Sequence, residues 1–314
     1  MEIGNDSGPA PEGPSGRDYS VGVTGLVSRT FSLWMRRLGS YILIVGIISV
    51  LMSAVSFVVL YLFYGPAAFV LVDLIFSDPL GLLLLIIDYT GITDILLFVI
   101  VITLSIVTML VGAIVGGGAI KFALQDYGNP GAGDVSSALS YGASRAVTLI
   151  VTQLLQGLVI AIPLLPGLGI MIVSAVAFDP MDPSTWTSIA AGGIILLVGA
   201  LITLYLLVRL IPSIAVVVAE EDRSAVGAIK RAYQITGGAF WHTLGGVIIL
   251  AIAIFVVALV LATIVGAVTF MSAALTLVGS LIISLLISPL NYIFQAVLYR
   301  DLESRAKQEE ADWW

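Results

Sequence analysis

The sequence predicts an all-α fold, a polytopic membrane helix bundle with six transmembrane helices, and three observations favour it. Of its 314 residues, 59% are hydrophobic and 11% are charged, whereas soluble domains carry about 25% charged residues. Stretches such as 41–62 are apolar on every side, unlike the alternating strands of a transmembrane barrel. Residues 232–299 contain no Lys, Arg, Asp or Glu, and because one span needs about 20 apolar residues, this stretch crosses the membrane twice.

The first part of the chain predicts one amphipathic helix and two spans. Residues 21–38 place apolar and polar side chains on opposite faces, which is typical of a helix lying in the membrane plane. Spans are expected at 40–64 and 95–118. Between them, 67–93 consists of two apolar pieces that are each too short to span, and we interpret it as an outer-surface or re-entrant segment. The alternative is an extra span, which would bury an aspartate in hydrocarbon.

The middle of the chain predicts a second short helix and a broken span. Asp134 is expected to cap a helix that runs to Arg145. Span three covers about 147–177, and the prolines at 163 and 166 should kink or break it near mid-bilayer. Span four covers about 188–211.

Residues 220–241 form the most charge-dense interior segment, and we expect a third in-plane helix there. Its apolar stripe would comprise Val226, Ile229, Tyr233 and Phe240, opposite Arg223, Gly227, Lys230, Arg231 and Gln234. Spans five (about 243–267) and six (about 272–298) follow. Four-residue spacing of Ala258, Ala262 and Gly266, and of Ser280, Ser284 and Ser288, indicates close packing of this hairpin or, alternatively, a dimer interface.

The distribution of charge predicts the orientation. All thirteen Lys and Arg fall on one side of this threading, whereas the outer segments 65–94, 178–187 and 268–271 contain six acids and no base. Because basic residues collect on the cytoplasmic side, we expect a multi-pass protein of the cell (plasma) membrane with both termini cytoplasmic. The basic residues expected to contact the inner leaflet are Arg29, Arg36, Arg37, Arg223, Lys230 and Arg231.

The chain also reads as three copies of one unit, each an in-plane helix followed by a transmembrane hairpin. The copies cover about 21–127, 134–222 and 223–302, and each enters the membrane in the same orientation. This predicts parallel repeats within a single membrane domain, 21–302. Residues 1–20 are expected to be a disordered cytoplasmic tail, and 303–314 a charged cytoplasmic tail.

The last third of the chain resembles a known family. The segments Ala-Val-Val-Val-Ala-Glu-Glu at 215–221, Ala-Ile-Lys-Arg-Ala-Tyr at 228–233 and Leu-Tyr-Arg-Asp-Leu at 298–302 are similar to the membrane domain attached to some glycerophosphodiester phosphodiesterases and its stand-alone relatives. The resemblance implies a six-span helical fold and no chemistry, because catalysis in those fusions belongs to a separate soluble barrel.

The sequence offers no catalytic set. His242 is its single histidine, and no Gly-rich phosphate loop precedes a Lys. His242 is interpreted as an interfacial residue, with proton sensing as the alternative. The absence of cysteine excludes disulfides and thiolate metal sites, and a net charge of −7 argues against a nucleic-acid partner. We expect no enzyme activity, cofactor or metal.

The most polar groups within the predicted spans are four amides, Gln153, Gln156, Asn291 and Gln295. Such residues face the bundle interior or a cavity, where they act as interhelical hydrogen-bond partners or form a polar substrate site. The leading hypothesis is a non-enzymatic scaffold or subunit of a membrane assembly, with the lipid bilayer and a membrane-protein partner or a homo-oligomer as its contacts. The alternative is a transporter or channel for a small polar or lipid-like solute, and a lipid-modifying enzyme comes third.

Overall fold

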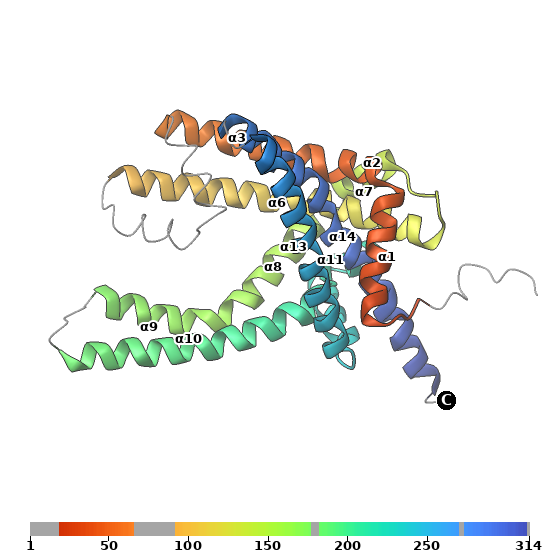
Figure 1. Ribbon diagram of the computed structural model, residues 1–314. Helices are drawn as coiled ribbons and strands as arrows, with labels where there is room; N and C mark the ends of the chain where they lie inside the picture. Colours follow the sequence, from red (N-terminus) through yellow and green to blue (C-terminus); the bar gives the residue numbers. More distant parts are fainter. Residues whose placement is uncertain (1–18, 66–91, 177–181, 270–272, 313–314) are drawn as a thin grey trace, which may run out of the picture.

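The computed structural model describes residues 19–65, 92–176, 182–269 and 273–312, and these residues are helical with short turns (Figure 1). Six of the helical segments are long and apolar enough to cross a membrane, which confirms the predicted all-α, six-span class. The expectations for residues 1–18 and for 67–91 lie outside the described residues, as do parts of the two other outer turns.

The first hairpin begins with α1 (Val23–Arg36), which leads into a nearly continuous span made of α2 (Leu38–Tyr41), the π-helical turn η2 (Ile42–Gly46) and α3 (Ile47–Tyr64). Its return helix, α6 (Ile92–Gly128), is 37 residues long. It therefore extends ten residues beyond the predicted end of span two. This extension carries Asp126 to the end of the bundle where it meets Arg36 and Arg37 of the first segment. We call this the charged end of the molecule.

The second hairpin begins with α7 (Val135–Ser144), capped as predicted by Asp134, whose carboxylate accepts from the Ser137 amide at 2.7 Å. The span then follows α8 (Ala146–Ala161), a 3₁₀ turn at η3 (Ile162–Leu164) and α9 (Leu165–Val176). The predicted break in span three is confirmed, since the turn contains Pro163. The return helix is α10 (Pro183–Leu210), followed by the short α11 (Ser213–Ala219).

The third hairpin is preceded by α12 (Ala225–Ile235), where the Ser224 hydroxyl accepts from the Gly227 amide at 3.2 Å. It consists of α13 (Phe240–Thr269) and α14 (Ala273–Asp312). α14 continues through Pro289 and on to Asp312. The segment expected to be a tail from residue 303 is thus a helical extension of span six as far as 312.

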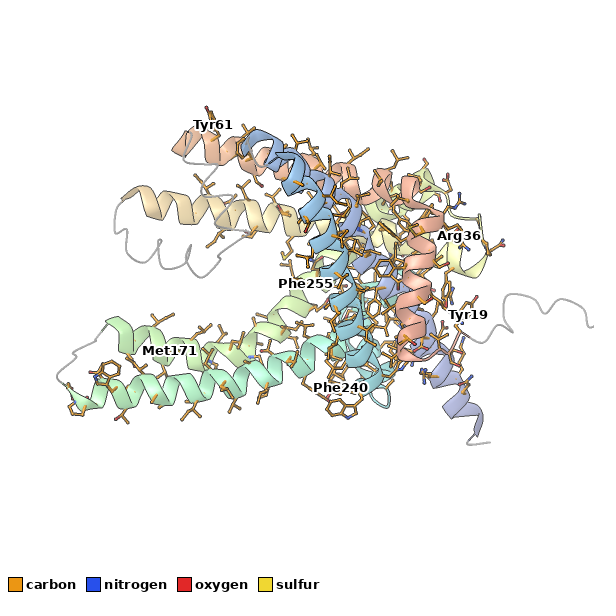
Figure 2. The ribbon with its side chains drawn as sticks, viewed as in Figure 1. Tyr19, Arg36, Tyr61, Met171, Phe240 and Phe255 are labelled. Atoms are coloured by element: carbon orange, nitrogen blue, oxygen red, sulfur yellow. The ribbon has the colours of Figure 1, made fainter. Side chains whose placement is uncertain are left out.

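The short helices join the hairpins at the charged end of the molecule. α1 packs against α13 and α14, α7 against α6, and α12 against α8 and α11. Each short helix therefore lies on a hairpin other than the one it leads into. Away from this end the hairpins diverge, and α9 packs chiefly against α10. Tyr61 on α3 and Met171 on α9 mark two separated arms in Figure 2.

The buried face of α12 differs from its most apolar stripe. The side chains that it buries are small except at Ile235: Ala225, Ala228, Ala232 and Ile235. Val226 and Tyr233 from the predicted stripe are instead 66% and 40% exposed. Because alanines permit close approach, α12 lies tightly on α8 and α11, and Val226 faces outward, as expected for a helix bordering lipid.

Close packing of α13 and α14 does not use the predicted small residues of span five. Ala262 and Gly266 are exposed. The close approach occurs instead at Gly279, where a Cβ would collide with the Val265 side chain. The four-residue spacing at Ala258, Ala262 and Gly266 was therefore misassigned to the hairpin interface.

Candidate functional site

A turn between α10 and α11 creates the first wall of the candidate site. α10 ends at Leu210, and α11 begins after Pro212, whose ring prevents a regular helix from continuing. The Leu210 carbonyl accepts from Gln156 Nε2 at 3.1 Å and from Ser213 Oγ at 2.5 Å. One glutamine of span three is thus held against the broken backbone of span four.

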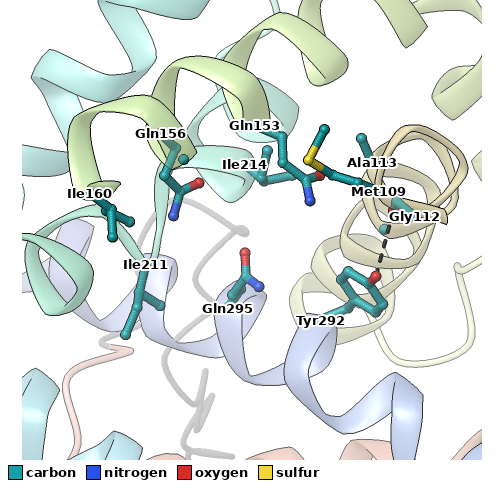
Figure 3. Close-up of a pocket in the computed structure, with 12 residues that line it drawn as sticks. Met109, Gly112, Ala113, Gln153, Gln156, Ile160, Ile211, Ile214, Tyr292 and Gln295 are labelled. Carbon is teal, nitrogen blue, oxygen red and sulfur yellow. Dashed lines mark hydrogen bonds between the residues drawn. The ribbon is translucent and has the colours of Figure 1, made fainter. Parts of the chain in front are cut away.

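Next to this turn lies a cavity of about 340 Å³ between α6, α8, α14 and the α10–α11 connection (Figure 3). None of its lining residues carries a charge. They are Met109, Gly112, Ala113, Gly116, Gln153, Gln156, Gly157, Ile160, Ile211, Ile214, Tyr292 and Gln295. The cavity is therefore neutral, with hydrogen-bonding groups on two opposing walls.

Three glutamines supply most of the polar lining. Gln153 and Gln156 are three residues apart and share one face of α8, and Gln295 faces them from α14 in Figure 3. The side-chain oxygen of Gln295 is buried and accepts no hydrogen bond from any described residue. A buried acceptor without a donor costs about 1–3 kcal/mol, so this oxygen is suited to a donor from a ligand.

Glycines of α6 make room for Tyr292, which lines the cavity. A Cβ at Gly116 would lie 2.9 Å from Tyr292 Cδ1 and 3.0 Å from Cζ. The Tyr292 hydroxyl donates to the Gly112 carbonyl at 3.5 Å, a long bond. The ring therefore occupies space that any side chain at Gly116 would fill.

A larger groove of about 880 Å³ lies beside the cavity, between α3, α6 and α14. Four residues line both spaces: Met109, Gly112, Gln153 and Tyr292. The groove is mainly apolar, with hydroxyls from Ser49, Ser53, Ser56, Thr108 and Ser284. A neutral polar cavity thus adjoins a larger, mainly apolar groove, and no residue lining the groove is charged.

The structure brings together three of the four predicted amides. Asn291 is exposed and lines neither space, so its predicted place in the bundle interior is wrong. Tyr292, the next residue along α14, faces α6 instead. Tyr292 was missed by sequence reasoning, although the four-residue spacing of Gly112 and Gly116 indicated where a close approach would occur.

At the charged end, the basic residues of α1 bind a buried carboxylate. Asp126 on α6 is fully buried and accepts from Arg36 at 2.6 Å and from Arg37 at 3.3 Å. The Gly131 amide also donates to it at 2.8 Å. Arg29 likewise turns inward, donating to the Tyr127 hydroxyl. These contacts fix the C-terminal part of α1 to α6.

Two further acidic residues make contacts at the start of α1 and around α12. Asp301 on α14 is fully buried and accepts from the Val21 amide at 2.8 Å, with His242 Nε2 2.9 Å from the same carboxylate. Glu220 pairs with Arg223 and, at 3.4 Å, with Arg231.

These contacts bear on two expectations from the sequence, and the expected contact of the basic residues with the inner leaflet stays a prediction. Of the six basic residues expected at the inner leaflet, five thus bind acceptors within the protein, whereas Lys230 is exposed. Arg36 and Arg37 turn toward Asp126 because a buried carboxylate requires partners. The interfacial interpretation of His242 also omitted its contact with Asp301.

Comparisons with known proteins add no further constraint. No family model matches the chain, and no match was found among curated proteins or among solved structures. Within the described residues, no group of three or more His, Cys, Asp and Glu side chains is placed to hold a metal ion. The site is therefore interpreted from its own geometry, and the resemblance to the phosphodiesterase-associated membrane domain stays a prediction.

Proposed function

We propose that this protein is a non-enzymatic carrier that binds a lipid-like amphiphile inside the membrane. The proposal rests on one observation: the neutral glutamine cavity and the apolar groove adjoin and share four lining residues. This favours the solute-binding alternative over the scaffold that the sequence placed first. The expected ligand has an uncharged polar group and at least one hydrocarbon chain.

The polar group would bind among the three glutamines. Gln295 offers a buried acceptor, and a primary amide such as Gln153 offers both donors and an acceptor. Hydroxyl or amide groups complement this set. A charged headgroup does not, because burying an ion without a counter-charge is costly, and the cavity lining contains none.

The hydrocarbon chain would occupy the groove between α3, α6 and α14. Its lining is mainly aliphatic, with Val45, Ile48, Leu281 and Ile287 among the contributors. Burial of each CH₂ contributes about 0.8 kcal/mol when it leaves water. In a bilayer this gain is already made, so the glutamines must supply the discrimination between this ligand and bulk lipid.

The experiment measures binding of a fluorescent monoacylglycerol to the purified protein in nanodiscs. Gln153→Leu combined with Gln295→Leu should weaken binding by about tenfold or more, since two hydrogen bonds of about 0.5–1.5 kcal/mol each are lost. Asn291→Leu is the matched control, because it removes an amide from the same helix as Gln295 outside the cavity. It should bind the probe as the wild type does.

Carrier activity is measured separately, as movement of the same probe between leaflets of proteoliposomes. The wild type and Asn291→Leu should accelerate this movement, and the double variant should not. A folded double variant with unchanged binding and movement would contradict the proposal.

The scaffold or subunit role is the second candidate, and the α9–α10 hairpin favours it. This hairpin projects from the bundle and exposes large apolar side chains such as Ile172, Ile194 and Leu197. Lipid covers such surfaces, and so would a partner span. A stoichiometric protein that co-purifies in mild detergent and cross-links to this hairpin would support this role.

A further inference from the structure

A second polar cluster lies near the end of α10 and plays no part in the glutamine cavity. Arg209 is 7% exposed, and its guanidinium carbon lies 3.8 Å from the ring centroid of Tyr233 and 5.6 Å from that of Tyr205. Tyr205 is one turn earlier on α10, whereas Tyr233 comes from α12. The cluster therefore forms where two helices meet.

The charge of Arg209 has no anionic partner among the described residues. No described carboxylate lies within 4.0 Å of it, and its Nε is buried without an acceptor. Arg36, Arg223 and Arg305, by contrast, each pair with a carboxylate. Burying a cation without a counter-ion costs free energy. The two tyrosine rings and the C-terminal end of α10 offset part of that cost. They leave the buried Nε of the guanidinium without an acceptor.

Two hydroxyls complete a donor set beside this cation. The Tyr205 and Tyr233 hydroxyl oxygens lie 3.4 Å apart, and the two side chains are 39% and 40% exposed. A guanidinium flanked by hydroxyl donors matches the oxygens of a phosphate group, which it binds with charge-assisted hydrogen bonds. We propose that Arg209, Tyr205 and Tyr233 form a binding site for a phosphate-type oxyanion.

The surroundings place this donor set at the level of lipid headgroups. The Phe240 ring is 5.2 Å from the Tyr205 ring, and neighbouring Trp241 is 79% exposed. Exposed aromatic side chains at the end of a span are typical of the membrane–water boundary. Both a phospholipid headgroup and soluble phosphate reach this level.

A purely structural role explains the cluster less well. α10 and the end of α12 also contact each other away from the guanidinium, where the Thr236 hydroxyl lies 2.9 Å from the Arg209 carbonyl and 2.7 Å from the Ala232 carbonyl. This contact needs no guanidinium. The two helices are thus positioned by a contact independent of the Arg209 charge, and the cation is available for a ligand.

The test is native mass spectrometry of the purified protein with three probes: phosphatidic acid, diacylglycerol with the same chains, and inorganic phosphate. Arg209→Gln should weaken phosphatidic acid binding by about tenfold or more, as expected for a lost charge-assisted bond. The double variant Tyr205→Phe, Tyr233→Phe keeps both rings against Arg209 and removes only the hydroxyls. It should also bind more weakly, which keeps the test valid if Arg209→Gln fails to fold.

Lys307→Gln is the control, since it removes the same charge from an exposed position on α14, and its binding should match the wild type. If inorganic phosphate displaces phosphatidic acid, the site takes phosphate from either source; if it does not, the lipid headgroup is the ligand. Equal phosphatidic acid binding by the wild type and the tyrosine variant, or equal binding of diacylglycerol by the wild type, would overturn the proposal. Neither result bears on the glutamine cavity.

Discussion

Alanine substitutions at two glycines of α6 should have opposite effects, because only one of them faces the Tyr292 ring closely. At Gly116 a Cβ would lie 2.9 Å from Tyr292 Cδ1, and still closer to Cε1, so the ring must move. At Gly112 the nearest atom would be the Tyr292 hydroxyl at 3.8 Å, an ordinary van der Waals contact.

The magnitudes follow from two opposing terms. Alanine in place of glycine within a helix stabilises it by about 0.5–1 kcal/mol. Inserting a methyl group into packed space costs about 1–3 kcal/mol. Gly112→Ala should therefore raise the free energy of unfolding by about 0.5–1 kcal/mol, and Gly116→Ala should lower it by about 1–2 kcal/mol.

The assay compares apparent Tm in detergent and probe binding for both variants. Gly116→Ala should lower Tm and weaken monoacylglycerol binding, since Tyr292 lines both the cavity and the groove. Adding Tyr292→Leu should restore part of the lost Tm by removing the clash. Indistinguishable Tm and binding for the two alanine variants would refute the assignment of the Tyr292 ring to the space beside Gly116.

Three further predictions concern the charged end and the threading. Asp126→Asn should lower stability by about 2–3 kcal/mol in chemical unfolding, since it weakens charged hydrogen bonds to two arginines; an unchanged midpoint would contradict the role assigned to this carboxylate. The Lys121 ammonium 2.5 Å from Glu221 lowers the pKa of that carboxyl below 4.5. Its stabilisation is present above pH 4.5 and lost as pH falls through the lowered pKa, so acidification should reduce Tm more in the wild type than in Glu221→Gln. With single cysteines, an impermeant thiol reagent should label Asp182→Cys and not Ser304→Cys in intact cells; external labelling of the latter would contradict the expected orientation.

The spans were predictable because they depend on local composition. Apolar runs of sufficient length must form helices in lipid, and the breaks at Pro163 and the cap at Asp134 follow from local chemistry. The helix ends were less predictable. α6 and α14 continue past the apolar stretch because their polar extensions bind the short helices, as Asp126 and Asp301 do. Such contacts join residues that are distant in sequence.

The candidate site was predictable in part, because polar residues within apolar spans are visible in the sequence. Gln153, Gln156 and Gln295 stood out as amides within apolar spans, and the structure gathers them. Asn291 had the same sequence signal but points elsewhere, because helix rotation is set by tertiary packing. Arg209 had no signal, since its missing counter-ion is apparent only in space. The three-repeat organisation stays a prediction, and it is supported by the regular packing of α1, α7 and α12 on hairpins that they do not lead into.

The proposed carrier function requires that an amphiphile occupy the cavity and the adjoining groove. Photo-crosslinking with a diazirine-bearing monoacylglycerol in nanodiscs, followed by peptide mapping, tests it most directly. Adducts should concentrate at groove positions such as Met52 and Met109, and excess unlabelled ligand and the double variant Gln153→Leu, Gln295→Leu should both reduce them. Adducts spread equally over exposed lipid-facing residues such as Ile194 and Leu197, and insensitive to the variant, would contradict it.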